Sequence, residues 1–384
     1  MPLGFLRMLL TSVLVVVVAS AASAQSPYGG RAPNFYVLDV GTGLVLAEQN
    51  ADIPLPPASM SKLVTLALLF DALRDSRVQM STTWTITRRA HEMGGSSMFL
   101  ETRHRPTTED LIRGIAIVSG NDAAVAVAEG LAGTEEAFAA MAQRRAEQLG
   151  MTQTSIANAS GWPNPHHRMS LRDLGILANY LVQEHAQYYH YLGETEYEWN
   201  DISQPNRVPL LGAGLGIDGL KTGHTEEAGY SLVGSARQGN RRVIFVFSGL
   251  NSATERSEEA ERIVSWAFRQ FAERTVVEAG ETVAMADVWM GAEELVPMVT
   301  ATDMAILVPV MAQGTVAARV EYDGPIAAPI IDGQELGRLV VEVEGLAPMT
   351  TPLVAGQAVA LGGFMPRMWT AASVIGQQLG LGEP

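Results

Sequence analysis

Two lysines stand apart among the basic residues of this 384-residue chain. Of 26 basic residues only Lys62 and Lys221 are lysines, and the remaining 24 are arginines. Arginine keeps its proton in proteins, whereas a desolvated lysine can lose it. A site that needs a neutral amine as a base, or a compact ammonium, therefore cannot accept arginine. The alternative is chance survival of two surface lysines, and the sequence around each of them argues against it.

Lys62 follows Ser59 by three residues and precedes the apolar segment 63–70. Apolar side chains recur at helical spacing here, which predicts a buried helix over residues 61–73. Residues three apart share a helix face, so Ser59 Oγ and Lys62 Nζ can meet. A serine hydroxyl is a weak nucleophile until a base takes its proton, and a desolvated lysine can be that base. A helix N-cap is the alternative interpretation of Ser59, because the spacing alone is common.

Lys221 opens the triplet Lys221, Thr222 and Gly223, which is followed by His224. Strand-like segments at 231–236 and 243–247 come next, with a turn between them. The triplet supplies an ammonium, a hydroxyl and a glycine at the start of a hairpin strand, where the glycine lets a substrate lie close to the backbone. An edge-strand lysine beside a turn glycine is the alternative.

A third triplet lies between the two lysines, at Ser119, Gly120 and Asn121. It opens a helix-like segment at 122–131. Ser119 offers a hydroxyl that can relay a proton, and Asn121 offers an amide that can bond a peptide carbonyl. A helix cap would be the preferred interpretation if this triplet stood alone.

Taken together, the three triplets resemble the serine penicillin-binding fold, which D-alanyl-D-alanine carboxypeptidases share with serine β-lactamases. Their order along the chain is the family's order, a strong signal although each triplet is weak alone. Stretches at 37–43, 57–59, 119–123, 158–161, 218–225 and 265–268 are similar to the carboxypeptidase branch in particular. The resemblance is close over residues 30–270 and looser beyond.

The resemblance implies a role for each matched residue. Ser59 would be the nucleophile, Lys62 its general base, and Ser119 the relay that delivers the proton to the departing D-alanine. Asn121 would hold the peptide backbone, and backbone N–H groups of Ser59 and His224 would form the oxyanion hole. Lys221 and Thr222 would bind the terminal carboxylate, assisted by Arg207 and Arg256, and Gly223 is expected to let the substrate lie close to the backbone. No cofactor is expected, and the scattered histidines lack metal-ligand spacing.

The expected substrates are therefore peptidoglycan stem peptides, with β-lactam antibiotics as inhibitors. A serine β-lactamase is the nearest alternative, but class A enzymes use a glutamate between the second and third motifs, and no glutamate lies between residues 148 and 183. An inactive wall-binding scaffold is the alternative from another class. A scaffold has no need for both lysines.

The first 24 residues are typical of a signal peptide. Arg7 precedes an apolar run at 8–18, and a small-residue cleavage site ends at Ala24. The run is shorter than a bilayer span needs. We therefore expect export to the periplasm, without disulfides because the chain has no cysteine. The formal net charge of −15 argues against nucleic acid as a partner.

The pattern predicts an α/β catalytic domain over residues 29–270, with helices packed on a mostly antiparallel sheet. Over residues 275–361 the sequence changes to short segments in which apolar and polar residues alternate, and this pattern predicts a small all-β, sandwich-like domain. The tail 364–384 carries apolar residues at 364, 368, 372, 375 and 379, an amphipathic stripe. The resemblance implies that this tail makes peripheral contact with the outer face of the inner membrane. Packing of the tail on its own domain is the alternative.

Overall fold

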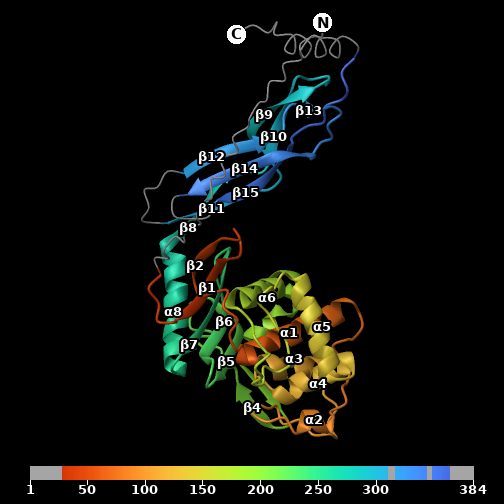
Figure 1. Cartoon of the computed structure of the whole chain (residues 1–384), viewed down its shortest axis with the longest axis vertical. Coiled ribbons are helices and arrows are strands. Elements are labelled where there is room, and N and C mark those ends of the chain that lie inside the picture. The colour runs from red at the N-terminus through yellow and green to blue at the C-terminus, as the bar shows by residue number, and fades with distance from the viewer. Residues whose placement is uncertain (1–27, 310–315, 344–347, 364–384) are drawn as a thin grey trace, which may run out of the picture.

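The computed structural model describes residues 28–309, 316–343 and 348–363. Its lower part combines a sheet with helices, and its upper part is built of strands (Figure 1). The expected signal peptide and amphipathic tail lie outside the described residues. Among the residues described, no helix is both long and apolar enough to cross a bilayer.

Within the described residues, an antiparallel sheet of five strands forms the centre of the lower part. Its strands lie in the order β2 (Val45–Gln49), β1 (Asn34–Asp39), β7 (Arg241–Leu250), β6 (Gly229–Gln238) and β5 (Ile217–Thr225). Apolar side chains on both faces of β1 and β7 are buried. Both faces must therefore be covered, as they are by helices (Figure 1).

One face of the sheet packs on a helical layer around α1 (Lys62–Arg74). Leu63, Leu66 and Phe70 are completely buried, and the whole of α1 apart from its last residue lies in the interior. A helix that is apolar on all sides belongs in a core. The other helices of this layer are α2 (Arg88–His91), α3 (Thr108–Ala116), α4 (Asn121–Ala132), α5 (Glu135–Gln148), α6 (Leu171–Glu184), α7 (Ala186–Tyr189) and the 3-10 turn η2 (His190–Gly193).

The opposite face of the sheet packs on α8 (Ala253–Gln270). Ala260, Ile263, Val264 and Ala267 recur at helical spacing and are fully buried against this face. The small hairpin of β3 (Glu196–Trp199) and β4 (Ile202–Pro205) lies apart from the main sheet. The sheet is therefore sandwiched between helices, with α8 on the side away from α1 (Figure 1).

The upper part begins directly after α8 and has its own apolar core. Val296, Met298 and Leu353 are completely buried there. Its strands are β8 (Phe271–Val277), β9 (Thr282–Trp289), β10 (Leu295–Thr300), β11 (Met304–Pro309), β12 (Val316–Tyr322), β13 (Ile326–Ala327), β14 (Glu335–Val343) and β15 (Met349–Ala355). The expected fold class, a mixed α/β catalytic part followed by a β-rich domain, is confirmed.

Among the described residues of the lower part, four α-helices do not correspond to segments expected from the sequence, namely the single-turn helices α2 and α7 and the longer helices α3 and α8. The helix-like segments at 135–149 and 171–183 correspond to α5 and α6. The start of the α1 region also differs in detail. Ser59 lies in the 3-10 turn η1 (Ala58–Ser61), and α1 itself begins at Lys62. Ser59 therefore precedes the helix by one tight turn, and its side chain still reaches the lysine three residues on.

Candidate active site

Lys62 lies at the centre of the site and makes three contacts through its amine. Its Nζ is 2.9 Å from Ser59 Oγ, 2.7 Å from Asn121 Oδ1 and 2.6 Å from the carbonyl oxygen of Ser160. The side chain is 0% exposed. Burial is the main cause that lowers the pKa of the Lys62 ammonium to about 7; the positive charge of Arg207 contributes to this shift, and Asp122 opposes it.

Ser59 reaches the amine because η1 turns the chain directly into α1. The turn is pressed against β5 at Gly223, where a side-chain Cβ would lie 3.0 Å from the carbonyl oxygen of Pro57. The sequence suggested that Gly223 makes room for a substrate. In the structure a Cβ at this position would face the turn that carries Ser59, so the glycine permits a close approach between two parts of the protein.

Asn121 begins α4, where both ends of its side-chain amide are engaged. Its Oδ1 accepts from Lys62, and its Nδ2 donates to the carbonyl oxygen of Gly94 at 2.7 Å. The second contact fixes which end of the amide faces the lysine. Ser119 is buried two residues earlier, with φ of 64°. The Nδ2 group carries two N–H donors and only one of them is bonded to Gly94, so the other is left for the expected bond to a substrate carbonyl.

Lys221 is also buried, at 1% exposure, on β5. Burial holds the pKa of its ammonium well below the usual range, and Lys62, Arg207 and Arg256 act in the same direction. Thr222 beside it is buried as well. Lys62, Lys221, Arg207 and Arg256 therefore lie close enough to act on one another electrostatically. Binding of a carboxylate by the last three stays a prediction.

The two arginines differ in how they are held. Arg207 donates from Nη1 to Ser96 Oγ at 2.6 Å. Arg256 lies on α8 with its guanidinium 5.6 Å from the centre of the Tyr230 ring. Its Nε is buried without a hydrogen-bond partner among the described residues. A carboxylate bound nearby would lower the electrostatic cost of this crowding of positive charge.

A cleft of about 570 Å³ opens at Ser59. Ser59, Asn121, Ser160, Trp162 and His224 are among the side chains and backbone that line it. His224 is exposed, and its ring lies 4.1 Å from that of Tyr230. The buried lysines thus lie behind a serine that remains open to a ligand.

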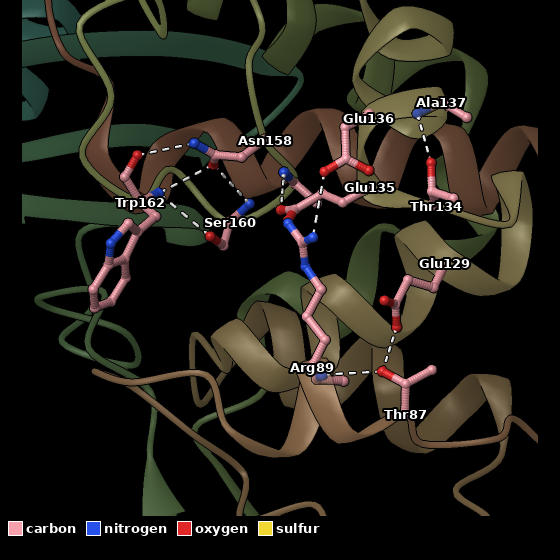
Figure 2. A network of polar contacts seen from close by, with 12 residues as sticks. Thr87, Arg89, Glu129, Thr134, Glu135, Glu136, Ala137, Asn158, Ser160 and Trp162 are labelled. Carbon is pink, nitrogen blue, oxygen red and sulfur yellow. Dashed lines mark hydrogen bonds and ion pairs between the residues drawn. The ribbon is translucent and has the colours of Figure 1, made fainter.

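Sequence reasoning missed the loop at residues 157–162, which contributes the Ser160 carbonyl. Asn158 Oδ1 accepts from the backbone N–H groups of Ser160, Gly161 and Trp162 at 3.2, 2.8 and 3.1 Å. Figure 2 shows this loop beside Arg89 and Glu135. A backbone carbonyl leaves no residue-type signature, but the stretch 158–161 was itself one of those carrying the family resemblance.

Comparison with known proteins agrees with this geometry. Residues 20–252 match the family model described as D-alanyl-D-alanine carboxypeptidase, and residues 271–361 match the C-terminal domain of penicillin-binding protein 5. The chain is 32% identical to D-alanyl-D-alanine carboxypeptidase DacF of Bacillus subtilis, over 94% of this chain and 95% of the relative.

Solved structures of penicillin-binding proteins are also similar to this chain. Penicillin-binding protein 5 from Haemophilus influenzae is 30% identical with a TM-score of 0.79, over 87% of this chain and 99% of that one. Penicillin-binding protein D2 from Listeria monocytogenes, in its ampicillin-bound form, is 29% identical with a TM-score of 0.58, over 64% of this chain and 100% of that one. The chain therefore belongs to the serine D-alanyl-D-alanine carboxypeptidase family, peptidase family S11.

Proposed function

We propose that this carboxypeptidase removes the terminal D-alanine of peptidoglycan stem peptides through an acyl-enzyme on Ser59, with Lys62 as the general base. The observation that carries the proposal is the set of three contacts at Lys62 Nζ. Two of its neighbours, Asn121 Oδ1 and the Ser160 carbonyl, can only accept hydrogen bonds. The third, Ser59 Oγ, can donate its proton.

A neutral amine has two hydrogens and one lone pair. If the two hydrogens go to the two acceptors, the lone pair is left for the hydroxyl of Ser59. The pKa of about 7 means that roughly half of the Lys62 side chains are neutral at pH 7. The geometry and the protonation state thus favour removal of the Ser59 proton, which activates this hydroxyl as a nucleophile.

In the proposed reaction, Ser59 Oγ attacks the carbonyl carbon of the penultimate D-alanine while its proton passes to Lys62. Backbone N–H groups of Ser59 and His224 stabilise the resulting oxyanion. Ser119 relays the proton to the nitrogen of the terminal D-alanine, and the C–N bond breaks. Water then hydrolyses the ester, which releases the shortened peptide and restores the Ser59 hydroxyl.

Lys221, Thr222, Arg207 and Arg256 would bind the carboxylate at the peptide's end. The pKa of the Lys221 ammonium is lowered by burial and by three neighbouring cations. An incoming carboxylate supplies the opposite charge and favours the protonated form. This requirement would restrict the enzyme to substrates with a free chain end.

We further propose that β-lactams acylate the same serine, an idea supported by the relative solved in its ampicillin-bound form. For location, we propose export by residues 1–24 to the periplasm, and peripheral contact with the membrane through the stripe at 364–379. The proposed domain limits are 29–270 and 275–361.

The experiment is release of D-alanine from a pentapeptide ending in D-Ala-D-Ala. Purified protein should release one D-alanine per peptide, and Ser59→Ala should release none above background. The same peptide with an amidated C-terminus is the matched substrate control, and it should be cut far more slowly. Equal cleavage of both peptides would contradict the carboxylate site, and release by Ser59→Ala would contradict the nucleophile.

A further inference from the structure

The Ala159–Ser160 segment, whose Ser160 carbonyl accepts from Lys62, is itself fixed by several hydrogen bonds. The carbonyl of Ala159 accepts from Thr65 Oγ1 at 2.7 Å, and the N–H of Ser160 donates to Asn158 Oδ1. The N–H of Ala159 donates to Glu135 Oε1 at 3.0 Å. All four backbone groups of Ala159 and Ser160 are therefore bonded, and the fourth bond is the one from Lys62 to the Ser160 carbonyl.

Glu135 is the charged member of this set, and it comes from α5. It is the first residue of α5 and only 5% exposed, although it is a carboxylate. Its Oε2 is paired with Arg89 of α2, while its Oε1 faces Ala159 (Figure 2). A buried carboxylate is costly unless its oxygens are bonded, and here they are bonded to an arginine and to the loop of the active site.

An ion pair that only joined α2 to α5 would not need a buried glutamate that also bonds Ala159. Glu136, the next residue, also pairs with Arg89, at 3.3 Å, and its side chain is 74% exposed. Among the described residues, no hydrogen bond joins Glu136 to the loop at 157–162. An exposed glutamate is thus sufficient for contact with Arg89, and the buried position of Glu135 additionally supplies the bond to Ala159.

We propose that Glu135 is a positioning residue for the catalytic lysine: it fixes the Ala159–Ser160 peptide so that the Ser160 carbonyl takes one hydrogen of Lys62 Nζ. This inference rests on the proposed function, because it concerns the base of that reaction. With the carbonyl fixed, the lone pair of the neutral amine is directed at Ser59. Without it, the amine can turn, and a misplacement of about 1 Å can cost about 100-fold in rate.

Loss of the Glu135 bond should shift the pH dependence of acylation in a definite direction. The Ser160 carbonyl stabilises the ammonium form of Lys62, so its displacement lowers the pKa of this side chain. The charged and titratable groups that act on Lys62 are Arg207, Asp122, Lys221 and His167. Burial lowers the pKa of His167 to about 4, so it stays neutral from pH 6 to 9. Of the groups at Glu135, Arg89 and Glu136 keep their charge over this range.

The experiment measures the rate of acylation by a fluorescent penicillin from pH 6 to 9 in full-length protein. Glu135→Ala should acylate at least about tenfold more slowly on the plateau, with its acid limb moved to lower pH. Glu136→Ala is the matched control, since it touches the same arginine, and its rate and acid limb should equal those of the wild type.

Glu135→Asp covers the case in which the alanine variant does not fold. Its shorter side chain can keep the ion pair, because Arg89 is long and half exposed, but it withdraws from Ala159. It should show the same slower acylation and the same direction of the pH shift. An acid limb that stays in place, or that moves to higher pH as water enters a loosened site, would overturn the inference even if the rate falls.

A companion variant separates this inference from the proposed function. Lys62→Arg should abolish acylation if Lys62 is the base at all. Loss of acylation in Lys62→Arg with wild-type behaviour in both Glu135 variants would refute the positioning role alone. Acylation that survives in Lys62→Arg would refute the base that both proposals share.

Discussion

Replacing Lys62 by arginine is the sharpest perturbation of the proposed chemistry, because it keeps the charge and removes the base. The amine is 0% exposed and lies within 2.9 Å of Ser59 Oγ. Arginine retains its proton with a pKa above about 12. The variant therefore keeps a buried cation near Ser59 but has no lone pair that can accept the serine proton at neutral pH.

The magnitude follows from the protonation of the wild-type side chain. With a pKa of about 7, roughly half of the Lys62 side chains are neutral at pH 7, against about one in 2,500 for an ordinary lysine. A guanidinium is neutral in fewer than about one molecule in 10⁵. General bases typically contribute about 10²- to 10⁴-fold, so we expect a loss of about 10³-fold, or about 4 kcal/mol in the barrier.

The assay is the second-order rate of acylation by a fluorescent penicillin between pH 6 and 9. The wild-type rate should rise through pH 7 and level off. Lys62→Arg should be flat and close to background, and Lys62→Met, a neutral side chain of similar length, should match it. A Lys62→Arg rate within tenfold of the wild type, or a wild-type acid limb near pH 10, would refute the assignment of the base.

Three other perturbations test the surroundings of the site. Lys221→Arg keeps a cation for the substrate carboxylate, so its kcat/KM on a D-Ala-D-Ala peptide should fall less than that of Lys62→Arg, and an equal loss would contradict the carboxylate role. Burial lowers the pKa of His167 to about 4, so the unfolded chain binds more protons below pH 6.5 and the fold loses on the order of 2 to 3 kcal/mol of stability by pH 4.5. Urea unfolding should show this loss reduced in His167→Asn, and an unchanged loss would exclude His167 as its source. Gly161→Ala would place a Cβ 1.8 Å from the carbonyl oxygen of Ala58 at a φ of +75°, so both the rate of acylation and the melting temperature should drop. Gly150→Ala has a similar φ of +79° but open space around the Cβ, so it should lower the melting temperature only slightly. Equal effects of the two variants would show that the contact with Ala58 is unimportant.

The parts of the site that sequence could predict are those set by local spacing. Ser59 and Lys62 meet because they are three residues apart at the start of a helix, and this geometry follows from the sequence alone. Their approach to Asn121, 59 residues further on, is a property of the tertiary fold. Only the family resemblance predicted that Asn121 lies beside Ser59 and Lys62.

The contacts that escaped prediction involve the backbone. The Ser160 carbonyl accepts from Lys62, and a carbonyl is present at every residue, so no side-chain pattern marks it. Glu135 escaped for a similar reason, because an acidic residue in the first turn of a helix is ordinary. Its bond to Ala159 depends on how α5 packs beside the loop.

Among the elements of the fold, α8 shows a signal that could have been used. Ser252 caps the helix by accepting from the N–H of Glu255, and the buried residues at 260, 263, 264 and 267 follow the helical period. From this segment only Arg256 and the stretch 265–268 enter the sequence prediction, both through the family resemblance. The alternating strands predicted over residues 275–361 have their strongest period-two patterning at 316–322 and 339–343, which lie in β12 and β14.

The central claim, that Ser59 forms the covalent intermediate, is tested most directly by mass spectrometry after exposure to penicillin. The intact protein should gain the mass of one drug molecule, and peptide mapping should place that mass on Ser59. Glu136→Ala should be labelled like the wild type, and Ser59→Ala should remain unlabelled. Labelling of Ser59→Ala at the wild-type level, or a label mapped to any other residue, would contradict the account.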